Sequence, residues 1–168
     1  MYPVTEDYLK VLVVSDTHGK HENLRQILFD VGNIDLLIHC GDTEGGEHAI
    51  MQMAGCPCRI VSGNNDFFSR LPSEEEFEIG KYKAFLTHGH YYGISMGYEK
   101  LLEEARFREA DIAFFGHTHR PLVMNKNGVY LVNPGSVSYP RQEGRLPSYC
   151  IMDIDREGEL HFTLNYLS

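Results

Sequence analysis

Short, continuously apolar runs recur along the chain, and each run stops at a cluster of polar residues. VLVV leads into SDTHG, LLIH into CGD and RIV into SGNND, and farther on AFL meets THGH and IAFF meets GHTH. Runs this short, and this rich in valine, isoleucine, leucine and phenylalanine, predict strands that are buried on both faces. We therefore expect five buried strands whose carboxyl ends carry polar side chains.

Three segments between these strands have the spacing of amphipathic helices. One has apolar residues at positions i, i+3, i+4 and i+7, namely Leu24, Ile27, Leu28 and Val31, and the same spacing recurs from residue 98 to residue 105. A shorter helix is expected over Glu47 to Ala54, with Gly55 as its C-terminal stop. Strand and helix thus alternate in the first part of the chain, which is typical of α/β proteins.

After residue 121 the pattern predicts hairpins instead of helices. Asn127-Gly128, a strong hairpin signal, lies between two strand-like runs, and a second hairpin is expected to turn at Arg156 to Gly158. Antiparallel strands after an α/β beginning imply two sheets or a mixed sheet, with helices on the outer faces. The acidic run Glu74 to Glu76 is expected to be a solvated loop or an edge strand.

Composition favours one cytoplasmic domain over residues 1–168. The chain is 42% hydrophobic, which is enough to bury a full core. It has no CxxC pair, so we expect reduced thiols at Cys40, Cys56, Cys58 and Cys150. The N-terminal stretch MYPVTEDYLK lacks the apolar centre of a signal peptide, and no apolar run approaches the ~18 residues of a membrane span. No membrane association is expected.

The net charge of -9 argues against stable nucleic-acid binding. Such binding depends on lysine and arginine side chains that replace counterions along the phosphate backbone. Phosphate chemistry in this chain would therefore need a local source of positive charge.

That source is suggested by the residues at the strand ends. In an open α/β sheet, ligands bind outside the carboxyl ends of the strands. There the sequence gathers imidazole, carboxylate and amide groups: Asp16, His18, Asp42, Asn64, Asn65, Asp66, His88, His90, His117 and His119. Each piece alone is typical of an ordinary turn or a packed histidine, but five at one edge favour a metal site. Mixed imidazole and carboxylate ligands suit Mn, Fe, Zn or Ni.

The same pieces, in this order, resemble the calcineurin-like metallophosphoesterases. They read Asp16-Thr17-His18, Gly41-Asp42, Gly63-Asn64-Asn65-Asp66, His88-Gly89-His90 and Gly116-His117-Thr118-His119. NPGSVSYPR, which follows, looks like the small bacterial and archaeal phosphodiesterase branch. The resemblance implies an α/β fold that is a four-layer α-β-β-α sandwich of two mixed sheets, with the metal site at the carboxyl ends of the strands.

The resemblance also implies a ligand set for two divalent ions, with Mn²⁺ the first choice and Fe, Zn or Ni as alternatives. One ion would be held by Asp16, His18 and His119, the other by Asn64, His88 and His117, and Asp42 would bridge them. Two cations ~3.5 to 4 Å apart convert a bridging water into hydroxide and stabilise an in-line displacement at phosphorus. The two histidines of GHTH would thus serve different metals.

Charge at such a site would favour small phosphodiesters as substrates. Two divalent ions bring +4 and the carboxylates of Asp16 and Asp42 return -2, so the site is formally +2 in a protein of net charge -9. An anionic diester is attracted locally, whereas a long polyanion is repelled by the global field.

The sequence differs from many members of the wider family at two places, and both differences bear on the type of phosphate ester that is hydrolysed. Asn65 stands where many members have a histidine that protonates the leaving group, and TEGG follows Gly41-Asp42 where protein phosphatases have Asp-Arg-Gly. Both favour a diesterase over a phosphoprotein phosphatase. We expect Asn65 to contact substrate, and the candidate general acid is His90 or a metal-bound water. Arg141 is either a substrate phosphate donor or a surface arginine beside a turn.

Alternatives to the phosphodiesterase are a phosphomonoesterase and an interaction scaffold like the retromer subunit that shares this fold. A nuclease is disfavoured, because 168 residues leave no room for capping segments. Similar small phosphodiesterases often form homodimers or homotetramers. His39 and Ser15 are expected to be a packed core histidine and a strand-end residue, respectively, rather than a ligand and a nucleophile.

Overall fold

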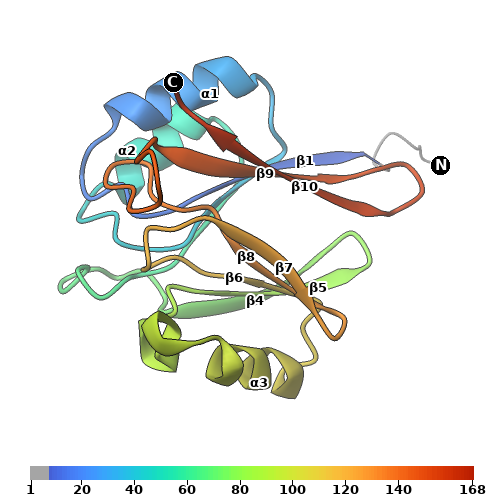
Figure 1. Cartoon of the computed structure of the whole chain (residues 1–168). Helices are drawn as coiled ribbons and strands as arrows, with labels where there is room; N and C mark the ends of the chain where they lie inside the picture. The colour runs from blue at the N-terminus through green and yellow to red at the C-terminus, as the bar shows by residue number, and fades with distance from the viewer. Residues whose placement is uncertain (1–7) are drawn as a thin grey trace.

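Two five-stranded mixed sheets face one another in the computed structural model, which describes residues 8–168 (Figure 1). The first sheet has the strand order β10-β9-β1-β2-β3. Its strands are β1 (Leu9–Val14), β2 (Leu36–His39), β3 (Cys58–Ile60), β9 (Ser148–Ile154) and β10 (Leu160–Tyr166). The second has the order β4-β5-β6-β8-β7. Its strands are β4 (Glu74–Ile79), β5 (Tyr82–Thr87), β6 (Ile112–Phe114), β7 (Leu122–Lys126) and β8 (Val129–Asn133).

Helices cover the outer face of each sheet, so the α-β-β-α sandwich is confirmed. Helices α1 (Glu22–Val31) and α2 (Glu47–Ala54) lie on the first sheet, and α3 (Glu99–Phe107) lies on the second (Figure 1). Two single-turn 3₁₀ segments, His90–Tyr92 and Ile94–Met96, precede α3. The three amphipathic segments of the sequence are therefore all helical.

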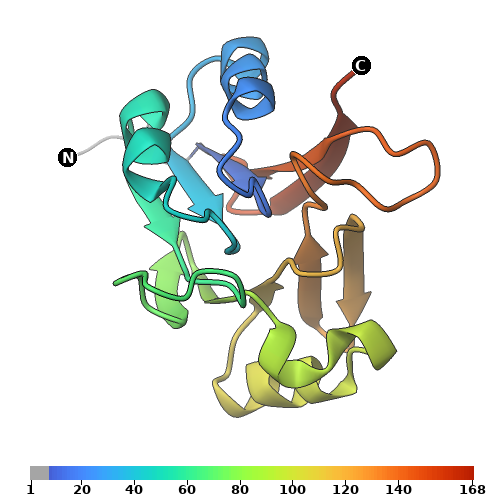
Figure 2. The same ribbon diagram turned by 90° about the vertical axis from the view of Figure 1, so that its left-hand side faces the viewer.

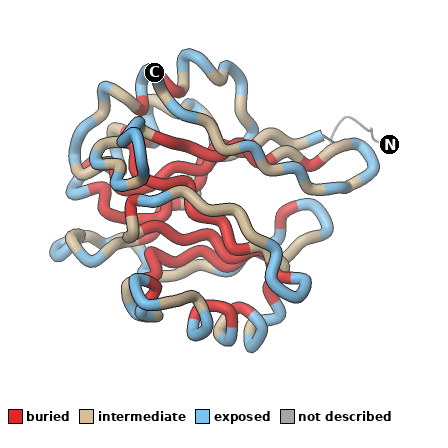
Figure 3. Tube along the Cα trace, in the orientation of Figure 1, coloured by how far each residue is buried: buried red, intermediate tan, exposed pale blue. Residues whose placement is uncertain are grey.

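Strand β1 shows why the apolar runs are continuous. Val11 and Val13 point into the core between the two sheets, whereas Leu12 and Val14 pack in the cluster beneath α1 and α2. Successive side chains of a strand point to opposite faces, so a strand buried on both faces needs apolar residues at every position. The central strands of both sheets are buried accordingly (Figure 3).

The predicted hairpins are also confirmed. β7 and β8 pair in antiparallel fashion across Asn127-Gly128, and β9 and β10 pair across residues 155–159. The acidic run Glu74 to Glu76 begins β4, an edge strand that pairs with β5.

The parallel strands direct their carboxyl ends to one edge of the sandwich. β1, β2 and β3 are parallel neighbours in the first sheet, and β5, β6 and β8 in the second. Figure 2 looks onto this edge, where the connecting loops gather. The hairpin turns lie at the opposite edge, because β4, β7 and β9 run antiparallel to their neighbours.

Among the described residues, no helix is both long and apolar enough to span a membrane. The expectation about a signal peptide falls largely on residues 1–7, outside the described residues. The cytoplasmic location stays a prediction. All four cysteines are free; Cys40 and Cys150 are buried, and Cys56 and Cys58 are partly buried.

Candidate metal centre

Carboxylate and imidazole groups from both sheets converge at the loop edge. The ligand atoms of Asp16, His18 and His119 lie within 4.8 Å of one another, and so do those of Asp16, Asp42 and His88. Asp16 and His18 follow β1, Asp42 follows β2, His88 follows β5, and His119 follows β6. Residues far apart in sequence therefore meet because parallel strands from two sheets end at the same edge.

The first group is compact. Asp16 Oδ1 lies 3.2 Å from His119 Nε2 and 3.5 Å from His18 Nε2, and the two Nε2 atoms are 3.3 Å apart. Three donor atoms that face a common point at these separations can share one cation.

Asp42 lies between the group of Asp16, His18 and His119 and a second group that contains His88, His117 and Asn64. Its Oδ2 is 3.4 Å from His88 Nε2 and 3.9 Å from His18 Nε2. The resemblance assigns these two histidines to different ions, so this oxygen is near donors from both proposed sites.

His117 and Asn64 complete the second group. His117 Nδ1 lies 3.0 Å from Asn64 Oδ1, and the ring centroids of His117 and His88 are 5.1 Å apart. The structure thus brings together all seven residues that the sequence proposes as ligands.

Backbone carbonyls orient two of the imidazoles. His88 Nδ1 donates to the carbonyl of Cys40 at 2.7 Å, and His119 Nδ1 donates to the carbonyl of Tyr139 at 2.7 Å. A hydrogen bond of this kind fixes the tautomer and leaves Nε2 with a lone pair directed at the centre, as metal-ligating histidines require.

Two buried atoms at the centre have no hydrogen-bond partner within residues 8–168. They are Asp16 Oδ1 and His88 Nε2, although both residues are fully buried. The other oxygen of Asp16 is well satisfied, because Ser15 Oγ donates to it at 2.6 Å and the His117 backbone N–H at 3.1 Å. Buried polar atoms are rarely left unpaired, and a carboxylate oxygen beside an imidazole nitrogen fits a divalent cation.

The carboxylates are held ionised. Burial alone would raise the pKa of Asp16, but the nearby imidazoles of His119 and His18 and the charge of His88 bring it well below its usual range. Burial likewise opposes ionisation of Asp42, yet contacts with His88 lower its pKa. The pKa values of His18 and His88 are raised despite burial, through Asp16 and Asp42 respectively. Protons and a cation therefore compete for these imidazoles.

The backbone at the centre adopts an unusual conformation. Left-handed φ angles between 50° and 71° occur at Asp16, His18, Asp42, Glu44, His117 and His119. Non-glycine residues adopt this region at a cost of about 1 kcal/mol or more each, and such strain clusters at functional sites.

Packing at the centre also leaves no space beside Asp42. A Cβ atom built on Gly63 would lie 2.1 Å from Asp42 Oδ1. Any side chain at this position would displace the carboxylate, which explains a glycine directly before Asn64 and Asn65.

Asp66 supports the centre without belonging to the ligand groups. Its Oδ2 accepts the backbone N–H groups of Asp42 at 2.8 Å and Gly63 at 2.7 Å, and its Oδ1 accepts that of Glu44 at 2.7 Å. Asp66 thereby joins the loops after β2 and β3. The sequence places it among the metal-capable residues but does not show this function, because a carboxylate directed at backbone N–H groups leaves no local pattern.

Asn65 contacts the centre through Asp42. Its backbone N–H donates to Asp42 Oδ1 at 2.9 Å, and its side-chain amide donates to Oδ2 at 2.9 Å. His90 lies beside the second group, with its ring centroid 5.4 Å from that of His88 and 6.1 Å from that of His117. Although the residue is half-buried, its Nδ1 atom is buried and has no hydrogen-bond partner among the described residues.

The structure confirms two predictions about residues outside the ligand set, namely that His39 is a packed core histidine and that Ser15 is a strand-end residue. His39 is fully buried, lies 3.0 Å from Thr17 Oγ1 through Nε2, and accepts the Gly41 N–H through Nδ1. Ser15 is buried at the end of β1 and donates to Asp16.

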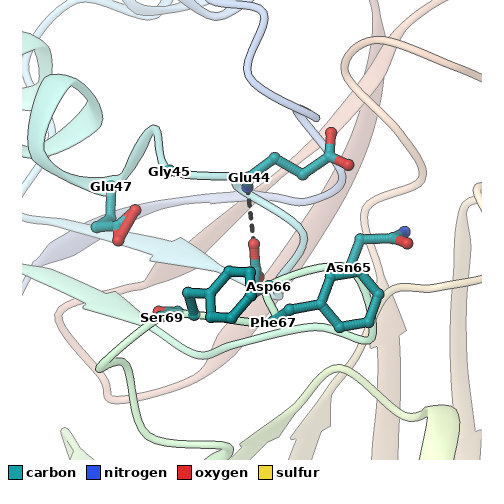
Figure 4. A pocket seen from close by; sticks show the side chains of 8 residues that line it. Glu44, Gly45, Glu47, Asn65, Asp66, Phe67 and Ser69 are labelled. Carbon is teal, nitrogen blue, oxygen red and sulfur yellow. Dashed lines mark hydrogen bonds between the residues drawn. The ribbon is translucent and has the colours of Figure 1, made fainter.

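Two cavities of different character flank the centre. One, of 390 Å³, is lined by acidic groups of Glu44, Glu47 and Asp66 and by the exposed rings of Phe67 and Phe68 (Figure 4). The other, of 370 Å³, is bounded by His18, His119, Tyr139, Arg141 and Arg145. Arg141 is exposed, and its backbone N–H donates to the carbonyl of His119 at 3.0 Å.

A four-layer sandwich with imidazole and carboxylate groups at its strand ends defines a metallophosphoesterase-type domain. The calcineurin-like phosphoesterase superfamily domain matches residues 9–157, and the chain belongs to this superfamily.

Curated relatives agree in length and name. The chain is 34% identical to the probable metallophosphoesterase YsnB of Bacillus subtilis, covering 89% of this chain and 86% of YsnB. It is 37% identical to the phosphodiesterase YfcE of Escherichia coli, covering 88% of this chain and 89% of YfcE.

Solved structures have the same fold. A protein of Streptococcus pneumoniae TIGR4 described as a predicted phosphoesterase superposes with a TM-score of 0.78 at 28% identity, covering 95% of this chain and 98% of that protein. Vps29 of Entamoeba histolytica, solved in complex with Zn²⁺, superposes with a TM-score of 0.76 at 24% identity, covering 94% and 99%. The likeness to Vps29 shows the fold alone.

Proposed function

We propose that this protein is a metal-dependent phosphodiesterase that hydrolyses small phosphodiesters at a dinuclear centre. The observation that carries the proposal is the position of Asp42 Oδ2, within 4 Å of both His18 Nε2 and His88 Nε2. One carboxylate oxygen beside donors of two groups is the arrangement that a bridging ligand needs.

The proposed ligands fall into two sets joined by Asp42. Asp16, His18 and His119 would hold one ion, and Asn64, His88 and His117 the other. The unpaired Asp16 Oδ1 and His88 Nε2 support one donor in each set. The mixture of imidazole and oxygen donors suits Mn²⁺, our first choice, and also Fe, Zn or Ni.

Bound divalent cations would acidify water and neutralise phosphoryl oxygens during an in-line displacement. The chain contributes positioning. Ser15 and the His117 N–H fix Asp16, and the Asn65 amide holds Asp42. Asn65 and Arg141 are proposed to contact the substrate, and His90 is proposed to deliver the proton to the leaving oxygen.

Hydrolysis of a chromogenic diester beside its monoester tests this function. Protein stripped with a chelator should be inactive, and added Mn²⁺ should restore turnover that favours the diester. A preference for the monoester would make the protein a phosphomonoesterase. No turnover of either ester with Mn²⁺, Fe²⁺, Zn²⁺ or Ni²⁺ would overturn the enzyme in favour of a scaffold.

The scaffold alternative rests on relatives named Vps29, including one from Schizosaccharomyces pombe at 29% identity. Against it, every proposed ligand position in this chain holds a residue type that binds metal.

His90→Ala should slow turnover of diesters with poor leaving groups more than that of nitrophenyl esters, and equal effects would remove His90 as the acid. A homodimer or homotetramer stays a prediction.

A further inference from the structure

Three arginines line two cavities beside the candidate metal centre. Arg141 and Arg145 border the cavity that His18 and His119 also line. Arg141 and Arg120 border a neighbouring cavity of 410 Å³, together with Thr118 and Ser95 among others. Arg141 therefore faces both spaces, one of which contains two proposed metal ligands.

The segment that carries Arg141 is fixed to the centre. Ser136 Oγ donates to the carbonyl of Asp16 at 2.9 Å, and Ser138 Oγ donates to that of Thr17 at 2.7 Å. The Arg141 N–H in turn donates to the His119 carbonyl. The backbone that presents this guanidinium is therefore set before any ligand binds, which lowers the entropic cost of binding.

These arginines lack acidic partners among the described residues. The ion pairs of that part of the chain include none from Arg120, Arg141 or Arg145. Only Arg59 and Arg108 form arginine ion pairs among the described residues. What distinguishes Arg120, Arg141 and Arg145 from the other unpaired arginines is their common position beside the candidate metal centre. In a chain with 24 acidic and 15 basic residues, three guanidinium groups without a carboxylate beside one site point to an anionic ligand.

A simple diester does not need these groups. Its single phosphoryl charge is met by the centre itself, which is formally +2 when two ions are bound. The opposite cavity, with Glu44, Glu47 and Asp66, would repel further negative charge. The loops that form the two sides, after β3 and after β8, lie apart in Figure 2.

We propose that the substrate is a phosphodiester with a second phosphate on one ester arm, and that Arg141, with Arg120 and Arg145, binds this phosphate. The planar guanidinium fork matches phosphate geometry through paired N–H donors. The proposal rests on the proposed phosphodiesterase function and names the substrate class of the same site.

Two substrates that differ by one phosphate test the proposal. Thymidine 5′-(4-nitrophenyl phosphate) and its 3′-phosphorylated counterpart have the same scissile bond and leaving group. With Mn²⁺ present, the 3′-phosphate should raise kcat/KM about tenfold or more, as charge-assisted hydrogen bonds allow. The ratio of the two kcat/KM values should fall toward one in Arg141→Gln and in Arg145→Gln, with Arg141→Lys intermediate.

Arg156→Gln is the matched control. It removes the same charge from the exposed β9–β10 turn at the opposite edge, so the ratio should stay at its wild-type value. Equal loss in Arg156→Gln would show a general field effect and overturn the proposal. Thermal unfolding of each variant verifies that it is folded.

Binding without turnover separates this proposal from the proposed function. Calorimetry on the Mn²⁺-loaded protein compares thymidine 3′,5′-bisphosphate with thymidine 5′-monophosphate, neither of which contains a phosphodiester bond. We expect about tenfold tighter binding of the bisphosphate, lost in Arg141→Gln. Equal affinities, or turnover of both diesters at equal rates, overturn the arginine site. Absence of all turnover overturns the phosphodiesterase, and the calorimetric comparison still decides whether the arginines bind the second phosphate.

Discussion

The two edges of the sandwich form their turns in different ways. At the hairpin edge, the left-handed residues of the three hairpin turns are glycines and one asparagine: Gly80, Asn127, Gly128 and Gly158. At the loop edge, six aspartate, glutamate and histidine residues adopt the same backbone region. Glycine and asparagine enter this region cheaply, whereas residues with larger side chains do not.

The difference reflects what determines the turns at each edge. A turn made of Asn127-Gly128 is determined by backbone conformation, since the side chains are exposed. At the loop edge the turns bring the side chains of Asp16, Asp42 and His119 together at the candidate centre, and packing and hydrogen bonds hold the strained backbone. Mutations at the loop edge should therefore affect activity first, and mutations at the hairpin edge stability first.

The largest effect is expected for Asp42→Ala. Loss of the proposed bridging oxygen should lower kcat/KM for a chromogenic diester by about a thousandfold or more, because charge stabilisation at such a centre is worth several kcal/mol. Metal content measured by atomic emission should fall with activity. Asp30→Asn, on the exposed face of α1, is the matched control and should behave as wild type. Full turnover in Asp42→Ala would contradict the dinuclear centre.

The next effect concerns pH and the buried end of β2. Burial lowers the pKa of His39 to about 4, from an ordinary value of 6.5. Below pH 6.5 His39 is protonated in the unfolded chain, whereas in the folded protein it stays neutral until the pH falls to about 4. Stability is therefore fully present above pH 6.5 and is lost toward pH 4, by about 3 kcal/mol from this group.

Urea unfolding of the wild type and of His39→Gln, with chelator present, isolates this contribution. The variant removes the titrating ring, so its free energy of unfolding should depend less steeply on pH between 6.5 and 4. If the free energies of unfolding of the two proteins depend on pH in the same way, the lowered pKa of His39 does not contribute to acid destabilisation.

Asp66 gives an intermediate effect that tests its supporting role. Asp66→Ala leaves three backbone N–H groups without their acceptor, so kcat/KM should fall about 10- to 100-fold, as for outer partners of metal ligands. The free energy of unfolding should fall by about 1 to 3 kcal/mol. Asp66→Asn keeps one acceptor oxygen and should lie between. If Asp66→Ala changes neither kcat/KM nor the free energy of unfolding, Asp66 does not support the centre.

The smallest effect is expected at the hairpin edge. Gly128 has φ 91°, so Gly128→Ala should lower the free energy of unfolding by about 1 kcal/mol or slightly more. The kcat/KM should not change. Asn127→Gly is the matched variant, because glycine accepts the φ of 53° at that position, and it should stay near wild-type stability. A loss of activity in Gly128→Ala would remove the distinction between the two edges.

Local patterns were sufficient to predict most of the fold. The run VLVV alternates between two cores, and the spacing around Leu24 and Ile27 fixes one face of a helix, so each pattern follows from side-chain direction within a single element. Convergence of the proposed ligands was also predictable, because parallel strands end at a common edge. The charged start of β4 could be assigned only as a loop or an edge strand, since three glutamates obscure the alternation.

Interactions between distant loops were not predictable. Nothing in the residues around Asp66 distinguishes a carboxylate that binds backbone N–H groups from one that binds metal. Arg120 and Arg141 are separated by the β7–β8 hairpin and part of a loop, and only the fold places them beside the same cavity. Such features depend on which loops the fold brings together, and local sequence patterns do not contain that information.

The proposed ligands are drawn from both sheets, with Asp16 and Asp42 from one and His88 and His119 from the other. Each proposed cation would be held by residues of both sheets, so it would act as a clasp across the two halves of the sandwich, and it would bind the unfolded chain far less well. At a free metal concentration one hundred times its Kd, such a clasp adds about 2.7 kcal/mol to folding. The lifetime of this protein in a cell would then follow the supply of metal, and scarcity would remove the protein as well as its activity.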